Sequence, residues 1–243
     1  MDLPTRPATP PPPSAPVTTV ERTPRRTTTP AVPVRSSEPP TRKEPPPAAQ
    51  PATAAPASNA FDLALYYHRA GDFENALVQY RALLQANELN AQAHNNLGLL
   101  YQEKNLLDES ARELLRAVII EPGYARGHNN YGVTLLRQGK LDAAASEFRT
   151  VLALEPRNVD AMVNLGLVEK SAGQVERAKE SLVKALSVAP RHAAAHYNLA
   201  VLYEETGELS RAVEHYRAFL DNTGAEYADR APVVRARLAA LVK

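Results

Sequence analysis

Beyond residue 56, small and large apolar residues recur along the chain with a period of 34 residues. The periods begin at Ala57, Ala91, Ala125, Val159 and Ala193. Within each period, positions 4, 7, 8 and 11 fall on one face of a helix. Position 8 on that face is always small, and the residues are Ala64, Gly98, Gly132, Gly166 and Ala200. A second stretch has a small residue at position 20 and a large one at position 24, which is Tyr80, Leu114, Phe148, Leu182 or Tyr216. The pattern predicts two helices in each period, packed closely because small residues face large ones.

Helix-ending residues keep the same period. Position 15 tolerates the left-handed conformation that ends a helix, and its residues are Gly71, Asn105, Gly139, Gly173 and Gly207. Position 18 suits the start of the next helix, with Glu74, Asp108, Asp142, Glu176 and Ser210. Three of the periods end with a proline at position 32, which stops the second helix, at Pro122, Pro156 and Pro190.

This pattern resembles the tetratricopeptide repeat family, and Gly98, Tyr101 and Pro122 with Gly132, Phe148 and Pro156 carry the resemblance most clearly. The resemblance implies an all-α solenoid of antiparallel helix pairs, wound as a right-handed superhelix with the first helices lining a concave face. We expect five repeats, at residues 57–90, 91–124, 125–158, 159–192 and 193–226. Residues 227–243 are predicted to form a capping helix over the last repeat.

The first 56 residues differ sharply from the rest of the chain. They hold 17 of the 21 prolines, none of the 10 glycines, and few large apolar side chains. Such a segment cannot bury enough apolar surface to fold, so residues 1–56 are predicted to be a disordered, proline-rich tail. The tail is either a spacer, the interpretation that we favour, or a ligand for proline-binding domains through steps such as Pro30-x-x-Pro33.

Charge and cysteine content exclude several classes of function. The net charge is only +1 and the repeats carry slightly more acidic than basic residues, so nothing indicates nucleic-acid binding. The chain has no cysteine, which excludes disulfides and thiolate metal sites. No segment has the length and apolarity of a signal peptide or a membrane span. We therefore expect a cytoplasmic protein that does not insert into a membrane; the alternatives are a periplasmic location and membrane association through a partner. The sequence predicts no particular oligomeric state.

Asparagine recurs at position 6, away from the packing face, as Asn96, Asn130, Asn164 and Asn198. A regular row of amides can pair with the backbone of an extended peptide, and such a row resembles the asparagine ladder of tetratricopeptide proteins that bind extended segments. Aliphatic residues flank it at position 9. The predicted peptide-binding site adds Asn95, Asn129, Arg126 and Tyr197 to the row. The alternative is that the asparagines bond only locally and the aliphatic residues only pack neighbouring helices.

The histidines at position 4, His94, His128 and His196, are predicted to fill gaps between helices rather than to bind metal, because no carboxylate or cysteine is expected on their face at ligand spacing. The sequence contains no phosphate-binding loop, nucleophile elbow or paired acids on the period. We therefore expect no enzyme activity, no metal and no cofactor.

These features together predict a non-enzymatic scaffold that binds an extended segment of a partner protein on its concave face. The alternative hypothesis is a structural accessory subunit of an envelope, secretion or pilus-type assembly, tethered by the proline-rich segment.

Overall fold

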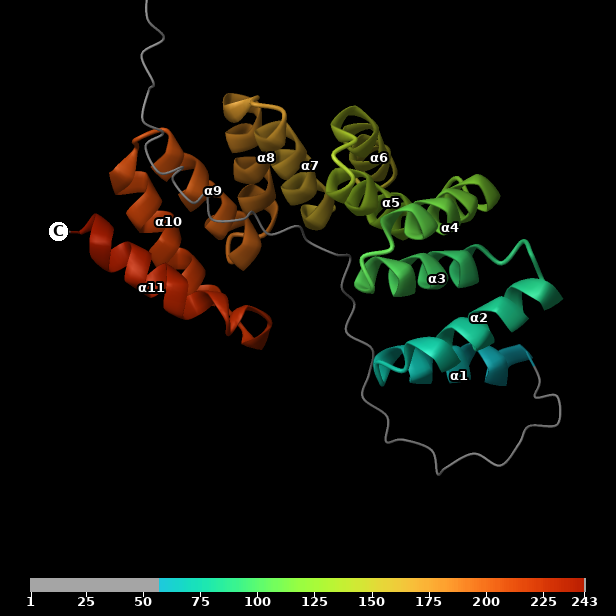
Figure 1. Cartoon of the computed structure of the whole chain (residues 1–243). Helices are drawn as coiled ribbons and strands as arrows, with labels where there is room; N and C mark the ends of the chain where they lie inside the picture. The colour runs from blue at the N-terminus through green and yellow to red at the C-terminus, as the bar shows by residue number, and fades with distance from the viewer. Residues whose placement is uncertain (1–56, 243) are drawn as a thin grey trace, which may run out of the picture. The chain divides into compact units, whose positions relative to one another are not determined.

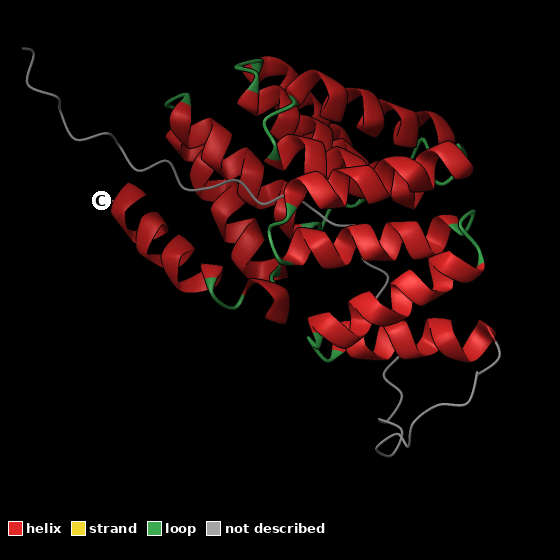
Figure 2. Ribbon diagram, turned by 45° about the vertical axis from the view of Figure 1, so that its right-hand side comes forward, coloured by secondary structure: helices red, strands yellow, loops and turns green. Residues whose placement is uncertain are grey.

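The computed structural model describes residues 57–242, so the predictions made for residues 1–56 lie outside the described residues. Within the described range the protein consists of helices joined by short turns (Figure 1, Figure 2). The first helices of the repeats are α1 (Ala57–Arg69), α3 (Ala91–Glu103), α5 (Ala125–Arg137), α7 (Val159–Ser171) and α9 (Ala193–Glu205). The second helices are α2 (Phe73–Ala86), α4 (Leu107–Ile120), α6 (Leu141–Leu154), α8 (Val175–Val188) and α10 (Leu209–Asn222). A short 3-10 turn, η1 (Ala225–Tyr227), leads to α11 (Arg230–Leu241). The fold is an α-solenoid of antiparallel helix pairs, as the sequence predicts.

The turn inside each repeat has the backbone geometry expected from position 15. Its four glycines, Gly71, Gly139, Gly173 and Gly207, have φ between 74° and 81°, and Asn105 has φ of 59°. In the first repeat the Gly71 N–H donates to His68 O at 3.1 Å and the Asp72 N–H donates to Tyr67 O at 2.9 Å. These two bonds form a Schellman motif, which satisfies the last carbonyls of the helix. The same motif recurs in the other repeats, which fixes a uniform reversal between first and second helix.

Close approach of the two helices in a repeat depends on the small residue at position 8. A Cβ atom built on Gly98 would lie 2.5 Å from Leu114 Cγ, and one on Gly132 would lie 2.7 Å from Phe148 Cε1. Both large residues are fully buried, so neither can move aside without disturbing the core. The first and last repeats have Ala at position 8 and a buried tyrosine at position 24.

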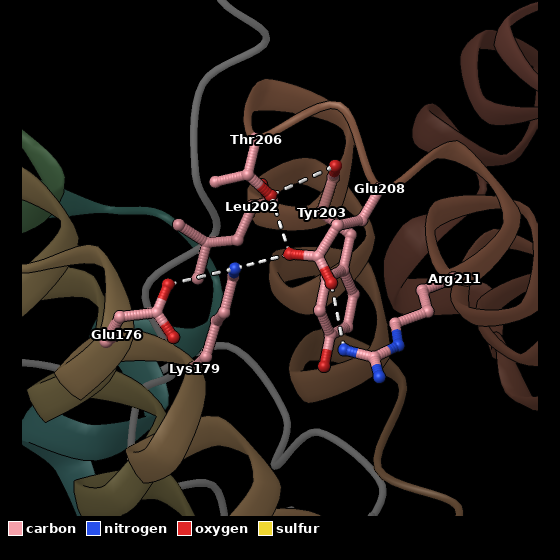
Figure 3. Close-up of polar contacts among 7 residues, drawn as sticks. All are labelled: Glu176, Lys179, Leu202, Tyr203, Thr206, Glu208 and Arg211. Carbon is pink, nitrogen blue, oxygen red and sulfur yellow. Dashed lines mark hydrogen bonds and ion pairs between the residues drawn. The ribbon is translucent and has the colours of Figure 1, made fainter.

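A network of charged side chains joins the fourth and fifth repeats (Figure 3). Lys179 of α8 lies between two carboxylates, with its Nζ 3.1 Å from Glu176 Oε1 and 2.6 Å from Glu208 Oε1. The hydrogen bond from Lys179 lowers the pKa of the Glu208 carboxyl. The Lys179 ammonium and the Arg211 guanidinium also lie 5.3 and 5.4 Å from the ring centroid of Tyr203. The network therefore ties the second helix of one repeat to both helices of the next.

The C-terminal helix α11 packs against α10 and buries Ala231 and Val234. Its Arg237 reaches back to α9, where its Nη2 lies 2.6 Å from Oε1 of the buried Glu204. The Tyr216 hydroxyl donates to Oε2 of the same carboxylate at 2.9 Å. These partners neutralise a charge that would otherwise be costly to bury. The predicted cap is thus a helix attached through both apolar and ionic contacts.

Each histidine at position 4 links its repeat to the turn that precedes it. The Nε2 atoms of His94, His128 and His196 lie 2.9 to 3.0 Å from the carbonyl oxygens of Glu88, Pro122 and Pro190. Because a carbonyl can only accept, Nε2 carries the proton and donates. The histidines therefore hold the inter-repeat turn against the first helix, which agrees with a packing role.

The prediction that no carboxylate shares the histidine face is wrong. His94 Nδ1 lies 2.7 Å from Glu113 Oε2, and His128 Nδ1 lies 2.6 Å from Glu147 Oε2. The carboxylates come from position 23 of the second helix, whose orientation the single-helix pattern does not give. The hydrogen bond to Glu113 raises the pKa of His94. Among the described residues, no three His, Cys, Asp or Glu side chains are grouped to hold a metal ion.

The fifth repeat replaces this carboxylate with a second histidine. His196 Nδ1 lies 2.9 Å from His215 Nδ1, and the Tyr203 ring stacks on His215 with centroids 5.5 Å apart. Since His196 donates through Nε2, the neutral pair requires His215 to donate through Nδ1. Burial and the neighbouring His196 lower the pKa of His215, Arg211 acts in the same direction, and Glu214 opposes them.

We predict that Gly98→Ala lowers the free energy of unfolding by about 1–2 kcal/mol, although alanine favours a helix over glycine by about 1 kcal/mol. The added methyl group must displace the buried Leu114 side chain. Urea denaturation followed by circular dichroism measures the change. The matched control is Gly123→Ala, because a Cβ there meets no atom within 4 Å. Equal stability of the Gly98 variant and the wild type would contradict the argument for close packing.

We predict that His215→Glu makes the protein less sensitive to acid. A histidine with a lowered folded pKa contributes stability above its ordinary pKa of 6.5, and this stability is lost as the pH falls through the folded pKa. The loss is about 1.4 kcal/mol for each pH unit by which the pKa is lowered. A glutamate at this position removes that loss and places a carboxylate against His196, as in the second and third repeats.

Urea denaturation at about pH 7.5 and pH 5.5 tests the sign, on either side of the ordinary histidine pKa. The control His215→Gln removes the titrating group without adding a charge. Acid sensitivity should fall in the order wild type, His215→Gln, His215→Glu. Identical pH profiles for the three proteins would show that His215 does not titrate with unfolding.

Candidate functional site

The face of the first helices that points away from the second helices carries the predicted asparagine row. The packing positions 4, 7, 8 and 11 face the second helix, and at 100° per residue positions 2, 6, 9 and 13 are centred on the opposite side. We call this surface the asparagine face, defined by its central positions 6 and 9 in the second to fifth repeats: Asn96, Asn130, Asn164, Asn198, Leu99, Val133, Leu167 and Val201. Each first helix therefore contributes one amide and one aliphatic side chain to a continuous strip.

The asparagines at positions 5 and 6 pair with one another between repeats. Asn130 Nδ2 of α5 donates to Asn95 Oδ1 of α3 at 2.9 Å, and Asn164 Nδ2 of α7 donates to Asn129 Oδ1 of α5 at 3.2 Å. Asn95 Nδ2 in turn donates to Asn96 Oδ1 at 3.1 Å. Some of the amide donors and acceptors are therefore used to set the distance between successive first helices. This agrees in part with the alternative that the asparagines bond locally.

The pairing stops at the fourth repeat because position 5 changes there. Val163 occupies that position in α7 and offers no amide to Asn198 of α9. Asn130, Asn164 and Asn198 are nevertheless all buried, at 2%, 0% and 2% exposure, whereas Asn96 is only half-buried. The position 6 asparagine is therefore more deeply buried in the third to fifth repeats than in the second. This holds even in the fifth repeat, where the preceding repeat has no asparagine at position 5.

The other two predicted site residues lie in different surroundings. Arg126, at position 2 of α5, is exposed at the edge of the asparagine face. Tyr197, at position 5 of α9, is buried in the core of the last repeat, with its ring centroid 5.4 Å from that of Phe219. The Arg230 guanidinium of α11 lies 5.5 Å from the Tyr197 ring, and burial raises the pKa of Tyr197. Tyr197 therefore connects the strip to the C-terminal helix.

A buried polar cluster beside the asparagine face was not anticipated from the sequence. Gln102 Nε2 of α3 donates to Thr134 Oγ1 of α5 at 2.8 Å, and Ser110 Oγ of α4 lies 3.0 Å from the same hydroxyl. Thr134 donates to Asn130 O at 3.2 Å. A signal was present, because Ser110 is the one residue at position 20 that is not alanine, and Thr134 and Gln102 depart from the period in the adjoining helices.

Two buried amide atoms next to the paired asparagines have no hydrogen-bond partner. They are the donor Asn129 Nδ2 and the acceptor Gln102 Oε1, on side chains that are 0% and 1% exposed. Leaving such a group unpaired costs about 1–3 kcal/mol.

We predict that the amide pair between Asn95 and Asn130 couples neighbouring repeats by about 1 kcal/mol. A double-mutant cycle with Asn95→Ala and Asn130→Ala measures this coupling in the free energy of unfolding. As the control, Asn95→Ala and Asn164→Ala should be additive, because these two side chains share no hydrogen bond. Additivity in both cycles would show that the amide pair does not hold the repeats together.

Comparison with known proteins agrees with the repeat architecture. The sequence profile of the middle TPR-like domain of cilia and flagella-associated protein 70 matches residues 100–221, half of the chain. The profile of the tetratricopeptide repeat matches residues 61–125. Among curated proteins, none matches the chain.

Solved structures of bacterial proteins share the fold. PilF from Pseudomonas aeruginosa is 26% identical, with a TM-score of 0.66 over 76% of this chain and 84% of PilF. MamA is 25% identical, with a TM-score of 0.60 over 68% of this chain and 91% of MamA. A thermophilic TPR protein from Thermus thermophilus is 23% identical, with a TM-score of 0.61 over 77% and 99% of the two chains. The 34-residue period, the helix pairs and the two profile matches all indicate the same architecture. The chain therefore belongs to the tetratricopeptide repeat family.

Proposed function

We propose that this protein is a non-enzymatic scaffold that binds an extended segment of a partner protein along the asparagine face. The tetratricopeptide fold supports a role in protein interaction, and the asparagine face is the surface best suited to a peptide. The observation that carries the proposal is the continuous strip of alternating amide and aliphatic side chains across four successive first helices.

The strip matches the repeating chemistry of an extended peptide. Such a peptide presents backbone N–H and C=O groups at regular intervals, with side chains on alternating sides. The aliphatic residues at position 9, Leu99, Val133, Leu167 and Val201, alternate with the amides at position 6 along the strip. This alternation suits a ligand that presents backbone groups and apolar side chains together.

The amide pairs support this function indirectly. Because Asn130 and Asn164 are held by Asn95 and Asn129, the strip is already ordered before a ligand arrives. A preorganised surface loses less conformational entropy on binding than a flexible one. In this proposal the asparagines position the helices and shape the strip, while their remaining hydrogen-bond donors and acceptors contact the ligand.

The alternative, an accessory subunit of an envelope or pilus-type assembly, stays a prediction. PilW, described as a widely conserved type IV pilus biogenesis factor, is 23% identical with a TM-score of 0.65 over 76% of this chain and 92% of PilW. At that identity the likeness concerns the fold alone. In the described part of the chain, no helix combines the length and apolarity that crossing a membrane requires. The cytoplasmic location also stays a prediction.

We predict that Asn96→Ala combined with Leu99→Gln weakens peptide binding about tenfold or more, because these two side chains, the half-buried members of the asparagine face, lose their contacts with a ligand. Binding peptides are first selected from an array of immobilised 12-residue peptides, and their affinity is measured by fluorescence polarisation. Circular dichroism verifies that the variant keeps its helices.

The control changes two exposed aliphatic residues of α4, Leu115→Gln and Ile119→Gln, which lie outside the asparagine face. This variant should bind the selected peptides as the wild type does. Unchanged affinity in the first variant, or a loss confined to the α4 variant, would place the binding surface elsewhere.

A further inference from the structure

The histidines of the fifth repeat have a different kind of partner from those of the other four. In each of the first four repeats one histidine ring nitrogen lies within 3.5 Å of a carboxylate oxygen, and these histidines are His68, His94, His128 and His192. In the fifth repeat two histidines face each other, with 2.9 Å between His196 Nδ1 and His215 Nδ1. Protonation strengthens the contact of a histidine with a carboxylate, whereas two protonated histidines repel each other.

The neutral pair accepts one proton but not two without losing its hydrogen bond. The ring centroids lie 5.2 Å apart and the Nδ1 atoms 2.9 Å apart, so each nitrogen points at the other. Because His196 Nε2 donates to Pro190 O, its Nδ1 accepts the proton of His215 Nδ1. A first added proton enters at His215 Nε2 and leaves this bond in place. A second must enter at His196 Nδ1, where it sets two N–H groups against each other.

The surroundings of the pair already hold positive charge. The Tyr203 ring of α9 stacks on His215. Lys179 of α8 and Arg211 of α10 lie over the same ring, at 5.3 and 5.4 Å from its centroid (Figure 3). Burial and the neighbouring His196 lower the pKa of His215, and Arg211 acts in the same direction. Protonation of the pair therefore adds charge to a site that is partly buried and flanked by two cations.

The carboxylates of the adjoining helices are bound to cations. Glu208 lies 2.6 Å from Lys179 Nζ and 2.8 Å from Arg211 Nη1. Ion pairs and a cation–π contact on the remaining sides of α9 join Lys170 to Glu205, His192 to Asp160, Arg237 to Glu204 and Arg230 to Tyr197. Glu214 of α10 is exposed and favours the protonated form of His215, but burial and the nearby positive charges outweigh it.

We propose that acid opens the fifth repeat selectively: protonation of both His196 and His215 favours a state in which α10 and α11 are detached from α9, while the first four repeats stay folded. In a stack of repeats each unit contacts only its neighbours, so one unit can open without unfolding the others. Helix α10 packs against α9 and α11, and can move away together with α11. This inference goes beyond the proposed function and does not depend on it.

The pH dependence of opening follows from the protons that the open state takes up. A histidine exposed by opening binds a proton below its ordinary pKa of about 6.5. In the closed state His215 binds its proton only at lower pH, so stability present above pH 6.5 is lost as the pH falls. Each additional proton bound by the open state raises the opening constant about tenfold for each pH unit.

Hydrogen exchange of the full-length protein, followed by mass spectrometry at about pH 7.5 and pH 5.5, measures this opening. Exchange rates are corrected for the pH dependence of unstructured peptides. Peptides from α10 and α11 should lose protection about tenfold or more at the lower pH. Peptides from α4, in the second repeat, should keep theirs and serve as the reference within the same sample.

The variant His215→Glu replaces the second histidine with a carboxylate, as in the second and third repeats, and should keep α10 protected at both pH values. The reverse exchange, Glu147→His, places a histidine against His128 and should transfer the acid sensitivity to α6. Circular dichroism at pH 7.5 verifies that both variants are folded. The two substitutions together test the pairing itself rather than the stability of one position.

The results distinguish selective opening from its alternatives. An equal loss of protection in α4 and α10 at pH 5.5 would mean that the solenoid opens as one unit, which overturns the proposal. Loss of protection in α10 that persists in His215→Glu would assign the acid response to other groups and overturn it as well. Unchanged protection of α10 in the wild type at pH 5.5 would show that the pair does not control opening.

Discussion

Close contact between a small residue at position 8 and a large residue at position 24 is the constraint on which the rest of the structure depends. Gly98 against Leu114 and Gly132 against Phe148 bring the first and second helices together so closely that a methyl group does not fit without movement. This contact sets the rotation of each first helix. Rotation in turn decides which side chains point to the next repeat and which point away, so the asparagine face is a consequence of packing in the core.

Most of the fold could be predicted from sequence because each repeat depends on local signals. Position 15 specifies the turn through residues that accept positive φ, as Gly71 and Asn105 show. The candidate site was harder to predict, because its geometry depends on contacts between helices. Pairing of Asn130 with Asn95 joins residues 35 positions apart, and the carboxylate of Glu113 reaches His94 from another helix. A helical period assigns a face to each residue but does not identify the atom that it meets.

The repeats differ most where polar groups are buried. His94 and His128 contact carboxylates, while His196 contacts His215. The pKa of His94 is raised and the pKa of His215 is lowered, so acid stabilises the fold at the second repeat and destabilises it at the last one. The last repeat also holds Glu204 between Tyr216 and Arg237. These substitutions give the C-terminal end of the solenoid its own electrostatics, although its backbone follows the same period as the others.

Burial of the asparagine face connects stability with recognition. Amides such as Asn164 stabilise the stack by pairing between repeats, and a peptide on the same strip would use the remaining amide hydrogen-bond donors and acceptors. A surface of this kind is favourable for a ligand that supplies backbone groups and aliphatic side chains together, and unfavourable to leave open to water.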